Sequence, residues 1–464
     1  MVKHPNRPAP QAVSSGHFLY CKSDHLHPCR FNLKRPEPES QPHLADSFPQ
    51  LLYGESFIKA FLAYVADVPV FSVFGMRILK GPVTGVPGTL RFPGAVSILV
   101  EKLEMQISSD PHRGLAGIID TDTIGWVLPH LDSAQAVESV SLFIAGLPDS
   151  VANRLVVGIA PFPCLDFEKT DTLENARKAA DHATILGASG IVVFNALTLN
   201  VSGDQLFEGG NIAGAMAEYK RGLRLDPENE NLHNSLGVCH GIKGEINTAM
   251  ACFEKTLAVN PTEIMAIYNT GYLYRLKGEL DMAIAAFLKA GNLDPGLFEA
   301  AFQAGQTYLS MGQPENSEPF LERAVTLKPL SNPAHRLLGE CLAAIGKHSG
   351  AETAFREAIR ISPQDAESLS MLGRLYEREN RNLDIAAVFH RQSVSIAPEN
   401  GRYHLRLARV LLKLGILDEA LDACRHAQSL GYPSEELLAE IMEKMTASAD
   451  ASKTVPESRP LFKN

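Results

Sequence analysis

Between residues 55 and 195, the apolar positions alternate between continuous runs and helical spacing. The runs "VFSVFGMRIL" and "RLVVGIAPF" predict buried strands, and "GIVVFN" predicts a last strand. In "GAVSILVEKLEMQI" and "TLENARKAADHATIL" the apolar residues recur at helical spacing, which predicts amphipathic helices. Alternating strands and helices favour a sheet with helices packed against it, so we expect an α/β domain over residues 55–195.

The segments "LAGIID" and "IGWVLPHL" flank an Asp-Thr-Asp-Thr turn and predict a β-hairpin. The helix predicted next, in "DSAQAVESVSLFIAGL", begins with the Asp and Ser residues that favour a capped start. The turn places Asp120 and Asp122 between apolar runs, close to Trp126, the only tryptophan. Two interpretations stay open: a turn whose side chains hydrogen-bond the local backbone, and a nucleotide or ion site.

From about residue 196 the pattern changes to an internal repeat of 34 residues. Alanine and aromatic positions follow the same register, as in Ala249 with Phe253 and Ala351 with Phe355. Three further series share this step: Gly203, Gly237, Gly271, Gly305, Gly339 and Gly373; Gly210, Gly244, Gly278, Gly312 and Gly346; and Pro227, Pro261, Pro295, Pro329 and Pro363. Small residues let paired helices approach closely, aromatics fill the space between units, and proline marks the turn to the next unit.

This pattern resembles the tetratricopeptide repeat, which implies an all-α superhelical solenoid of helix pairs. We expect seven units over residues 196–432, a capping helix at 433–446 and a disordered tail at 447–464. The fourth unit departs from the pattern at Pro314, Ser317 and Pro319. The sixth unit is one residue longer, and the seventh has Ala408 in place of the glycine.

The resemblance implies that the first helix of each pair lines a concave groove. Aromatic side chains in its middle and arginines toward its end favour a peptide with apolar or aromatic anchors and acidic residues. In the alternative, some of the arginines pair with Glu340, Glu367 or Glu377 and solvate the surface. The candidate groove residues are Asn234, Tyr268, Asn269, Tyr272, Arg275, Phe302, Gln306, Arg336, Arg374, Arg378, Arg402, Arg406 and Arg409. They do not reproduce the Lys/Asn clamp of repeats that bind a C-terminal carboxylate.

Residues 55–195 also resemble the GGDEF domains of bacterial diguanylate cyclases, through "IGWVLPHLDSAQA", "LVVGIAPFP" and "NARKAADHATILGASGIVVFN". The resemblance places residues 120–124, "DTDTI", at the family's signature, so that Thr123 stands at the acidic fourth position. It places the metal-binding aspartate of the first strand near Gly75, in a strand without a carboxylate. The family's inhibitory motif is absent from "PHRG", and "KGPVTGVPGTLRFPG" lacks the expected guanine contacts. Two-metal phosphoryl chemistry needs clustered carboxylates, so we expect a degenerate domain without cyclase activity.

Composition narrows the function further. The net charge of −10 argues against nucleic-acid binding, and seven dispersed cysteines without a CxxC pair favour reduced thiols. No secretory signal opens the sequence, and Lys59, Asp67 and Pro69 interrupt its most apolar stretch, so we expect a cytoplasmic protein without membrane insertion. Residues 1–50 are rich in Pro and His and predict a disordered tail. Whether Cys21, His25, His27 and Cys29 bind zinc stays open.

These observations predict a non-enzymatic bacterial adaptor without a cofactor, whose groove binds a protein segment. Self-association or a second protein partner is expected through residues 55–195. The alternative is a sensor of a nucleotide or cyclic dinucleotide that uses the degenerate domain for binding and the repeats as output. Neither a GxSxG nor an HExxH motif nor a Walker-type loop occurs. The identity of the partner, the biological process and the oligomeric state stay open.

Overall fold

The computed structural model describes residues 51–79, 92–108, 114–187 and 190–453. The predictions for the tail at 1–50, with its four Cys and His residues, and for residues 454–464 lie outside these ranges. The chain forms two compact units, one ending at Asn269 and the other beginning at Thr270. The first unit contains residues 55–195 together with the first helical repeats, so no boundary between units falls at residue 195.

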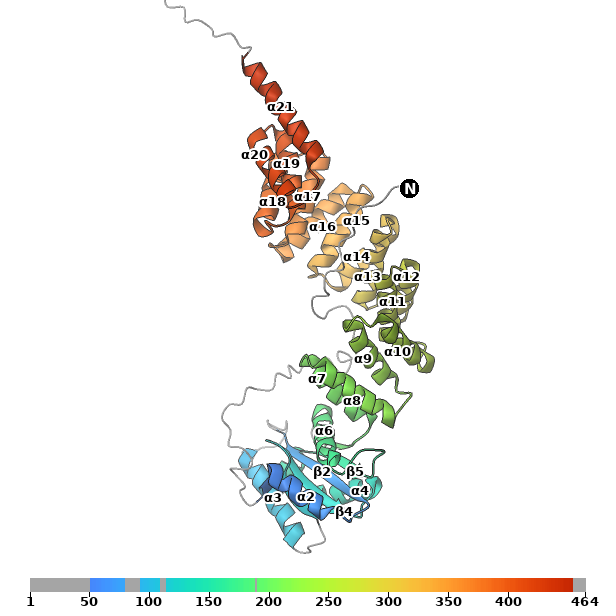
Figure 1. Cartoon of the computed structure of the whole chain (residues 1–464). Coiled ribbons are helices and arrows are strands. Elements are labelled where there is room, and N and C mark those ends of the chain that lie inside the picture. The colour runs from blue at the N-terminus through green and yellow to red at the C-terminus, as the bar shows by residue number, and fades with distance from the viewer. Residues whose placement is uncertain (1–50, 80–91, 109–113, 188–189, 454–464) are drawn as a thin grey trace, which may run out of the picture. The chain divides into compact units, whose positions relative to one another are not determined.

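The first unit contains a six-stranded mixed sheet whose central strand is β2 (Figure 1). β2 runs antiparallel to β4 and β5, and β3 and β4 form the predicted antiparallel hairpin. β1 and β6 pair in parallel with β3 and β5 at the two edges. In spatial order the strands are β1 (Leu52–Tyr53), β3 (Leu115–Ile118), β4 (Ile124–Pro129), β2 (Phe71–Ile78), β5 (Leu155–Phe162) and β6 (Ile191–Val193).

Helices cover both faces of the sheet, which confirms the predicted α/β arrangement. On β2, Phe74 and Met76 face one core with α3 and α4, whereas Phe71 and Val73 face the other core with α2 and α6. This division follows from the two-residue period of a strand. The helices are α2 (Gly54–Tyr64), α3 (Phe92–Ser108), α4 (Ser133–Ala145), α5 (Asp149–Ala152) and α6 (Asp171–Leu186). α4 has the predicted cap, because the Asp132 carboxylate accepts a hydrogen bond from the Gln135 backbone N–H at 2.9 Å.

A row of glycines crosses the sheet beneath α2 and α6. Gly117, Gly125, Gly75 and Gly158 are successive cross-strand partners on β3, β4, β2 and β5. A Cβ atom at Gly158 would lie 2.1 Å from the Ala180 backbone nitrogen, and one at Gly75 would lie 2.8 Å from the carbonyl oxygen of Ala176. The backbone of α6 therefore rests directly on β2 and β5, which fixes the position of the side chains that α6 carries.

Helix pairs form the rest of the chain, which Figure 1 shows in green to red. The first unit contains α7 (Ala196–Glu208), α8 (Ile212–Leu225), α9 (Glu230–Ile242), α10 (Ile246–Val259) and the start of α11 (Ile264–Lys277). The second unit contains the rest of α11, α12 (Leu280–Leu293), α13 (Phe298–Ser310), α14 (Pro314–Leu327), α15 (Asn332–Ala344), α16 (His348–Ile361), α17 (Ala366–Arg378), α18 (Leu383–Ile396), α19 (Gly401–Leu414), α20 (Leu417–Ser429) and α21 (Glu435–Lys453).

The repeated small and aromatic residues meet inside the pairs. A Cβ atom at Gly237 would lie 2.6 Å from the ring of Phe253, and one at Gly339 would lie 2.7 Å from the ring of Phe355. In the fourth unit α14 is continuous, with Pro314 in its first turn and Pro319 inside the helix. α21 extends to Lys453, so the structure corrects the expectation of a tail that starts at residue 447.

Candidate functional site

The turn between β3 and β4 is organised by Asp120. Its carboxylate accepts hydrogen bonds from the backbone N–H groups of Asp122, at 3.0 Å, and Thr123, at 2.9 Å. Burial acts against the charge of Asp120, but these hydrogen bonds and the charge of Arg77 outweigh it and keep its pKa below the ordinary value. Asp120 therefore has the local backbone role that its residue type favours in a turn.

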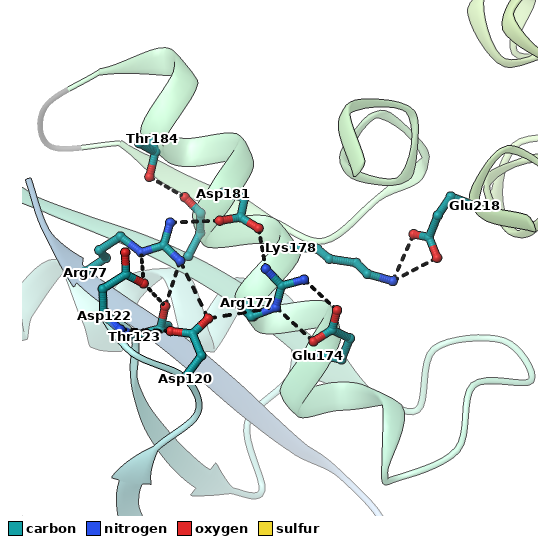
Figure 2. A network of polar contacts seen from close by, with 11 residues as sticks. Arg77, Asp120, Asp122, Thr123, Glu174, Arg177, Lys178, Asp181, Thr184 and Glu218 are labelled. Atoms are coloured by element: carbon teal, nitrogen blue, oxygen red, sulfur yellow. Dashed lines mark hydrogen bonds and ion pairs between the residues drawn. The ribbon is translucent and has the colours of Figure 1, made fainter. Parts of the chain in front are cut away.

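Arg77 of β2 lies at the centre of the charged groups around this turn (Figure 2). Its guanidinium nitrogens lie 3.0 Å from Asp122 Oδ1 and 2.8 Å from Asp181 Oδ1 of α6. It also donates a hydrogen bond of 2.7 Å to the hydroxyl of Thr123. The Arg77 side chain is only 12% exposed, so the aspartates and Thr123 replace most of its contacts with water.

Arg177 of α6 is the second cation of the network. It lies 2.6 Å from both Asp181 Oδ2 and Glu174 Oε1, and 3.9 Å from Asp120 Oδ2. The two guanidinium groups thus face four carboxylates, those of Asp120, Asp122, Glu174 and Asp181. Burial and the charge of Asp120 raise the pKa of Asp122, against the attraction of Arg77.

The protein's own guanidinium groups neutralise the aspartates of the turn. Gly75, near the expected place of the metal-binding carboxylate, is covered by α6, and Arg77 follows two residues later on the same face of β2. Among the described residues, no group of three or more Asp, Glu, His or Cys residues is arranged to hold a metal ion. Sequence reasoning missed Arg77 and Arg177. The available signal was one arginine inside an otherwise apolar strand.

Trp126 does not belong to this network. It is 4% exposed on the opposite face of the sheet. Its ring centroid lies 5.3 Å from that of Phe74 and 5.2 Å from that of Phe143. The tryptophan that follows the turn in the sequence is therefore a core residue.

In the first unit, the candidate groove residues Asn234, Tyr268 and Asn269 are at most 2% exposed. The Asn269 amide donates a hydrogen bond of 3.4 Å to Asn234 Oδ1, which links α11 to α9. Their side chains lie between the helices, so a ligand could contact them only after a rearrangement.

In the second unit, Tyr272 is buried and the guanidinium carbon of Arg275 lies 5.2 Å from the centre of its ring. Phe302 and Gln306 of α13 are half-buried. The Phe302 ring stacks on Phe298 with ring centroids 5.5 Å apart. Phe302 is thus the candidate aromatic with partial access to a ligand.

Two of the candidate arginines have acidic partners. Arg336 of α15 lies 3.3 Å from Asp365 Oδ1. Arg406 of α19 is 7% exposed, lies 3.4 Å from Glu367 Oε1 and donates a hydrogen bond of 2.6 Å to Ser370 Oγ. The Arg406–Glu367 pair agrees with the alternative interpretation, in which some of the arginines pair with neighbouring glutamates instead of binding a ligand.

Four other candidate arginines remain exposed: Arg374 and Arg378 of α17, and Arg402 and Arg409 of α19. Within residues 190–447, no carboxylate lies at ion-pair distance from these four side chains. Partial burial and the positive charges of Arg406 and Arg378 lower the pKa of Arg374. Because α17 and α19 contact each other, the four define an arginine patch, in which the nearby charges of Glu340 and Glu367 partly offset that of Arg374.

Comparisons with known proteins concern the helical part. A TPR repeat model matches residues 203–241, and tetratricopeptide repeat models match residues 266–296, 302–366 and 371–431. Comparison with curated proteins finds no match. In the part of the chain that the structure describes, no helix combines the length and hydropathy needed to span a membrane.

Similar solved structures include YrrB, "a TPR protein with an unusual peptide-binding site", at 22% identity and a TM-score of 0.36, covering 39% of this chain and 92% of that chain. A tetratricopeptide repeat protein from Parabacteroides merdae has 19% identity, a TM-score of 0.40 and coverages of 53% and 98%. Pseudomonas aeruginosa pilF has 19% identity, a TM-score of 0.42 and coverages of 47% and 97%. The family models and the paired helices agree: the C-terminal part of the chain is a solenoid of tetratricopeptide repeats.

Proposed function

We propose that the chain is a non-enzymatic adaptor that binds an acidic protein segment at the arginine patch of α17 and α19. One observation carries the proposal: Arg374 and Arg378 stay exposed with no carboxylate of residues 190–447 at ion-pair distance, whereas Arg336 and Arg406 are ion-paired. Phe302, half-buried on α13, is the proposed contact for an aromatic or apolar anchor. Tetratricopeptide repeats commonly serve as protein-interaction scaffolds, which is consistent with this role.

The charges explain why an acidic ligand is favoured. Arg374 and Arg378 are four residues apart on α17, where like charges repel each other. A carboxylate placed between them would remove this repulsion and accept bidentate hydrogen bonds. Hydrogen bonds to charged groups contribute about 1.5–3 kcal/mol each, so loss of this pair weakens binding by at least about tenfold.

Fluorescence anisotropy tests the proposal with short labelled peptides that contain Phe and either Asp and Glu, or Asn and Gln, or Lys. The full chain is expected to bind the acidic set, and affinity should fall steeply as salt increases. The double change Arg374→Glu and Arg378→Glu should abolish this binding. The matched control Arg360→Glu, at an exposed arginine of α16 that pairs with Glu357, should leave it intact. Equal binding of the acidic and the amide peptides would contradict the proposal.

For residues 55–195 we propose a degenerate GGDEF-like domain without cyclase activity. The order of elements supports it: after β1 and α2, the chain forms β2, α3, the β3–β4 hairpin, α4, the short α5, β5, α6 and β6, and the resemblance implies the same alternation of strands and helices. Arg77 is directed at the turn from the strand that would carry a metal-binding carboxylate. With the turn already neutralised from within, we expect neither turnover of GTP with Mg²⁺ nor a rise in Tm with GTP or a cyclic dinucleotide. Saturable stabilisation by either ligand would favour the sensor instead.

A further inference from the structure

The sheet continues into the first repeat almost without a linker. Two residues separate β6 from α7, and both are held in place. The Phe194 backbone N–H donates a hydrogen bond of 2.7 Å to the Ile159 carbonyl oxygen of β5. Asn195 caps α7, because its side chain accepts a hydrogen bond of 3.0 Å from the Thr198 backbone N–H.

The α/β domain and the first repeat share an apolar core. Leu199 of α7 is fully buried in the same cluster as Phe167, Phe194 and Ala183 of the α/β domain. Leu225, at the end of α8, packs against this cluster as well. The side of the first repeat that has no preceding repeat to cover it is therefore covered by α6 and the segment after β5.

A buried ion pair crosses the same junction (Figure 2). Lys178 Nζ of α6 lies 2.8 Å from Glu218 Oε2 of α8, and the two side chains are 7% and 9% exposed. Next to it, Arg221 of α8 lies 3.3 Å from Asp171 Oδ1, with its guanidinium carbon 4.6 Å from the centre of the Phe167 ring. Such a pair is tolerated inside a protein only while both partners are present, because removal of one leaves a buried charge.

α6 serves both structures through different faces. Arg177 and Asp181 point to the charged turn of the hairpin, whereas Lys178 and His182 contact Glu218 and Thr198 of the first repeat. The glycine row leaves no space between α6 and the sheet. α6 therefore cannot shift on the sheet without disturbing the junction.

We propose that the α/β domain is the N-terminal cap of the repeat array, and that α6, α7 and α8 open as one cooperative unit. Helical repeats bury their apolar faces against neighbours, and the end of an array needs a structure that covers its last face. This role is separate from the binding of an acidic segment, and it requires neither a nucleotide nor a metal ion.

Native-state hydrogen exchange on the full chain tests the proposal. In the unmodified protein, the slowest amides of α7 and α8 should open with the same free energy and denaturant dependence as those of α6. The change Lys178→Met leaves the buried Glu218 with Arg221, 3.8 Å away, as its remaining cation, so exchange should accelerate by at least about tenfold in all three helices together. Lys444→Met is the control, because it removes an exposed ion pair with Glu440 on α21. It should leave the exchange rates of α6, α7 and α8 unchanged.

The double variant Lys178→Met with Glu218→Met removes both charges and should recover most of the lost protection. It also keeps the test decisive if the single variant does not fold. The proposal that the α/β domain is the N-terminal cap would be contradicted if α6 and the α7–α8 pair had different free energies of opening. It would also be contradicted if hydrogen exchange accelerated in α6 alone. The peptide titration does not depend on this outcome, so the two proposals fail separately.

Discussion

At the scale of single residues, arginine positions decide the chemistry of both candidate sites. In the α/β domain, Arg77 of β2 and Arg177 of α6 neutralise aspartates that the sequence alone presents as a candidate site for an ion. On the repeats, Arg336 and Arg406 are ion-paired, whereas Arg374 and Arg378 face solvent. The same residue type thus stabilises the fold in one place and offers a binding group in another, and the difference lies in the neighbouring carboxylates.

Removal of the Arg77 guanidinium should turn the hairpin turn into a cation site. In Arg77→Ala, Asp122 loses its counter-ion and Asp120 and Asp181 keep only Arg177, at a cost to folding of about 1.5–3 kcal/mol. Mg²⁺ or Ca²⁺ should recover part of this loss, so Tm of the variant should rise with either ion. Arg77→Lys keeps the charge and is the control, expected to be as insensitive to the ions as the unmodified chain. A variant Arg77→Ala without a cation-dependent Tm would refute this account of the turn.

His390 should make the second unit sensitive to acid. It takes the place where other repeats have Phe253, Phe287 and Phe355, against Gly373, and neither ring nitrogen has a hydrogen-bond partner among the described residues. Burial and the charges of Arg406 and Arg409 lower its pKa from 6.5 to about 3. Below pH 6.5, the pKa of the histidine in the unfolded chain, the unfolded chain binds a proton at His390 and the folded chain does not. The free energy of unfolding therefore falls as the pH decreases toward 3.

The expected slope from His390 is at most about 1.4 kcal/mol per pH unit. Urea unfolding between about pH 7 and about pH 5 measures it, because the ordinary pKa of histidine lies in this interval. His390→Phe should be more stable throughout and should lose this part of the pH dependence. His426→Phe, at an exposed position of α20, should keep the slope of the unmodified chain. Equal slopes for His390→Phe and the unmodified chain would show that His390 is not the responsible group.

At the scale of elements, periodicity was sufficient for most of the fold. It predicted β2, β5 and the helix pairs, because each has enough residues to show its period. It missed β1 and α5, which have two and four residues, and it ended α21 seven residues early, where the apolar pattern stops but the helix continues to Lys453. Elements of two to four residues are too short to show a hydrophobic period. The end of a helix is not determined by its apolar face alone.

The candidate sites were less predictable, because they depend on contacts between distant segments. Arg77 and Asp181 are 104 residues apart in sequence and meet only because β2 and α6 pack together. Asn234 and Asn269 lie at groove positions of the repeat pattern, yet the packing of α9 and α11 buries them. Exposure is a property of the packed pairs, and the repeat pattern alone cannot assign it residue by residue.

The seating of α6 on the glycine row is testable by adding a methyl group. In Gly158→Ala the new Cβ would lie 2.1 Å from the Ala180 backbone nitrogen, so α6 must move or the strand must bend. Overpacking of this kind costs about 1–3 kcal/mol, to be measured as a fall in the free energy of unfolding. Gly146→Ala, whose nearest neighbour would be 3.4 Å away, is the matched control and should cost clearly less. Equal losses in the two variants would show that α6 is not held by close contact at Gly158.

At the scale of the whole molecule, the chain has a net charge of −10, yet four exposed arginines gather on α17 and α19. A local excess of positive charge on an acidic protein favours an acidic partner at that patch and disfavours acidic partners elsewhere. The α/β domain covers the first repeat, and the second unit contains the arginine patch. The binding role and the capping role thus belong to different residues, and each can be removed without the other.

Affinity capture from a lysate of the organism that encodes the chain tests the central claim most directly, followed by mass spectrometry of cross-linked peptides. Three full-length baits are compared: the unmodified chain, the double variant Arg374→Glu with Arg378→Glu, and Arg360→Glu. A partner cross-linked to α17 or α19 through an acidic segment should be retained by the unmodified chain and by Arg360→Glu, and lost from the double variant. If the double variant retains the same partner at the same cross-links, the arginine patch is not the binding surface.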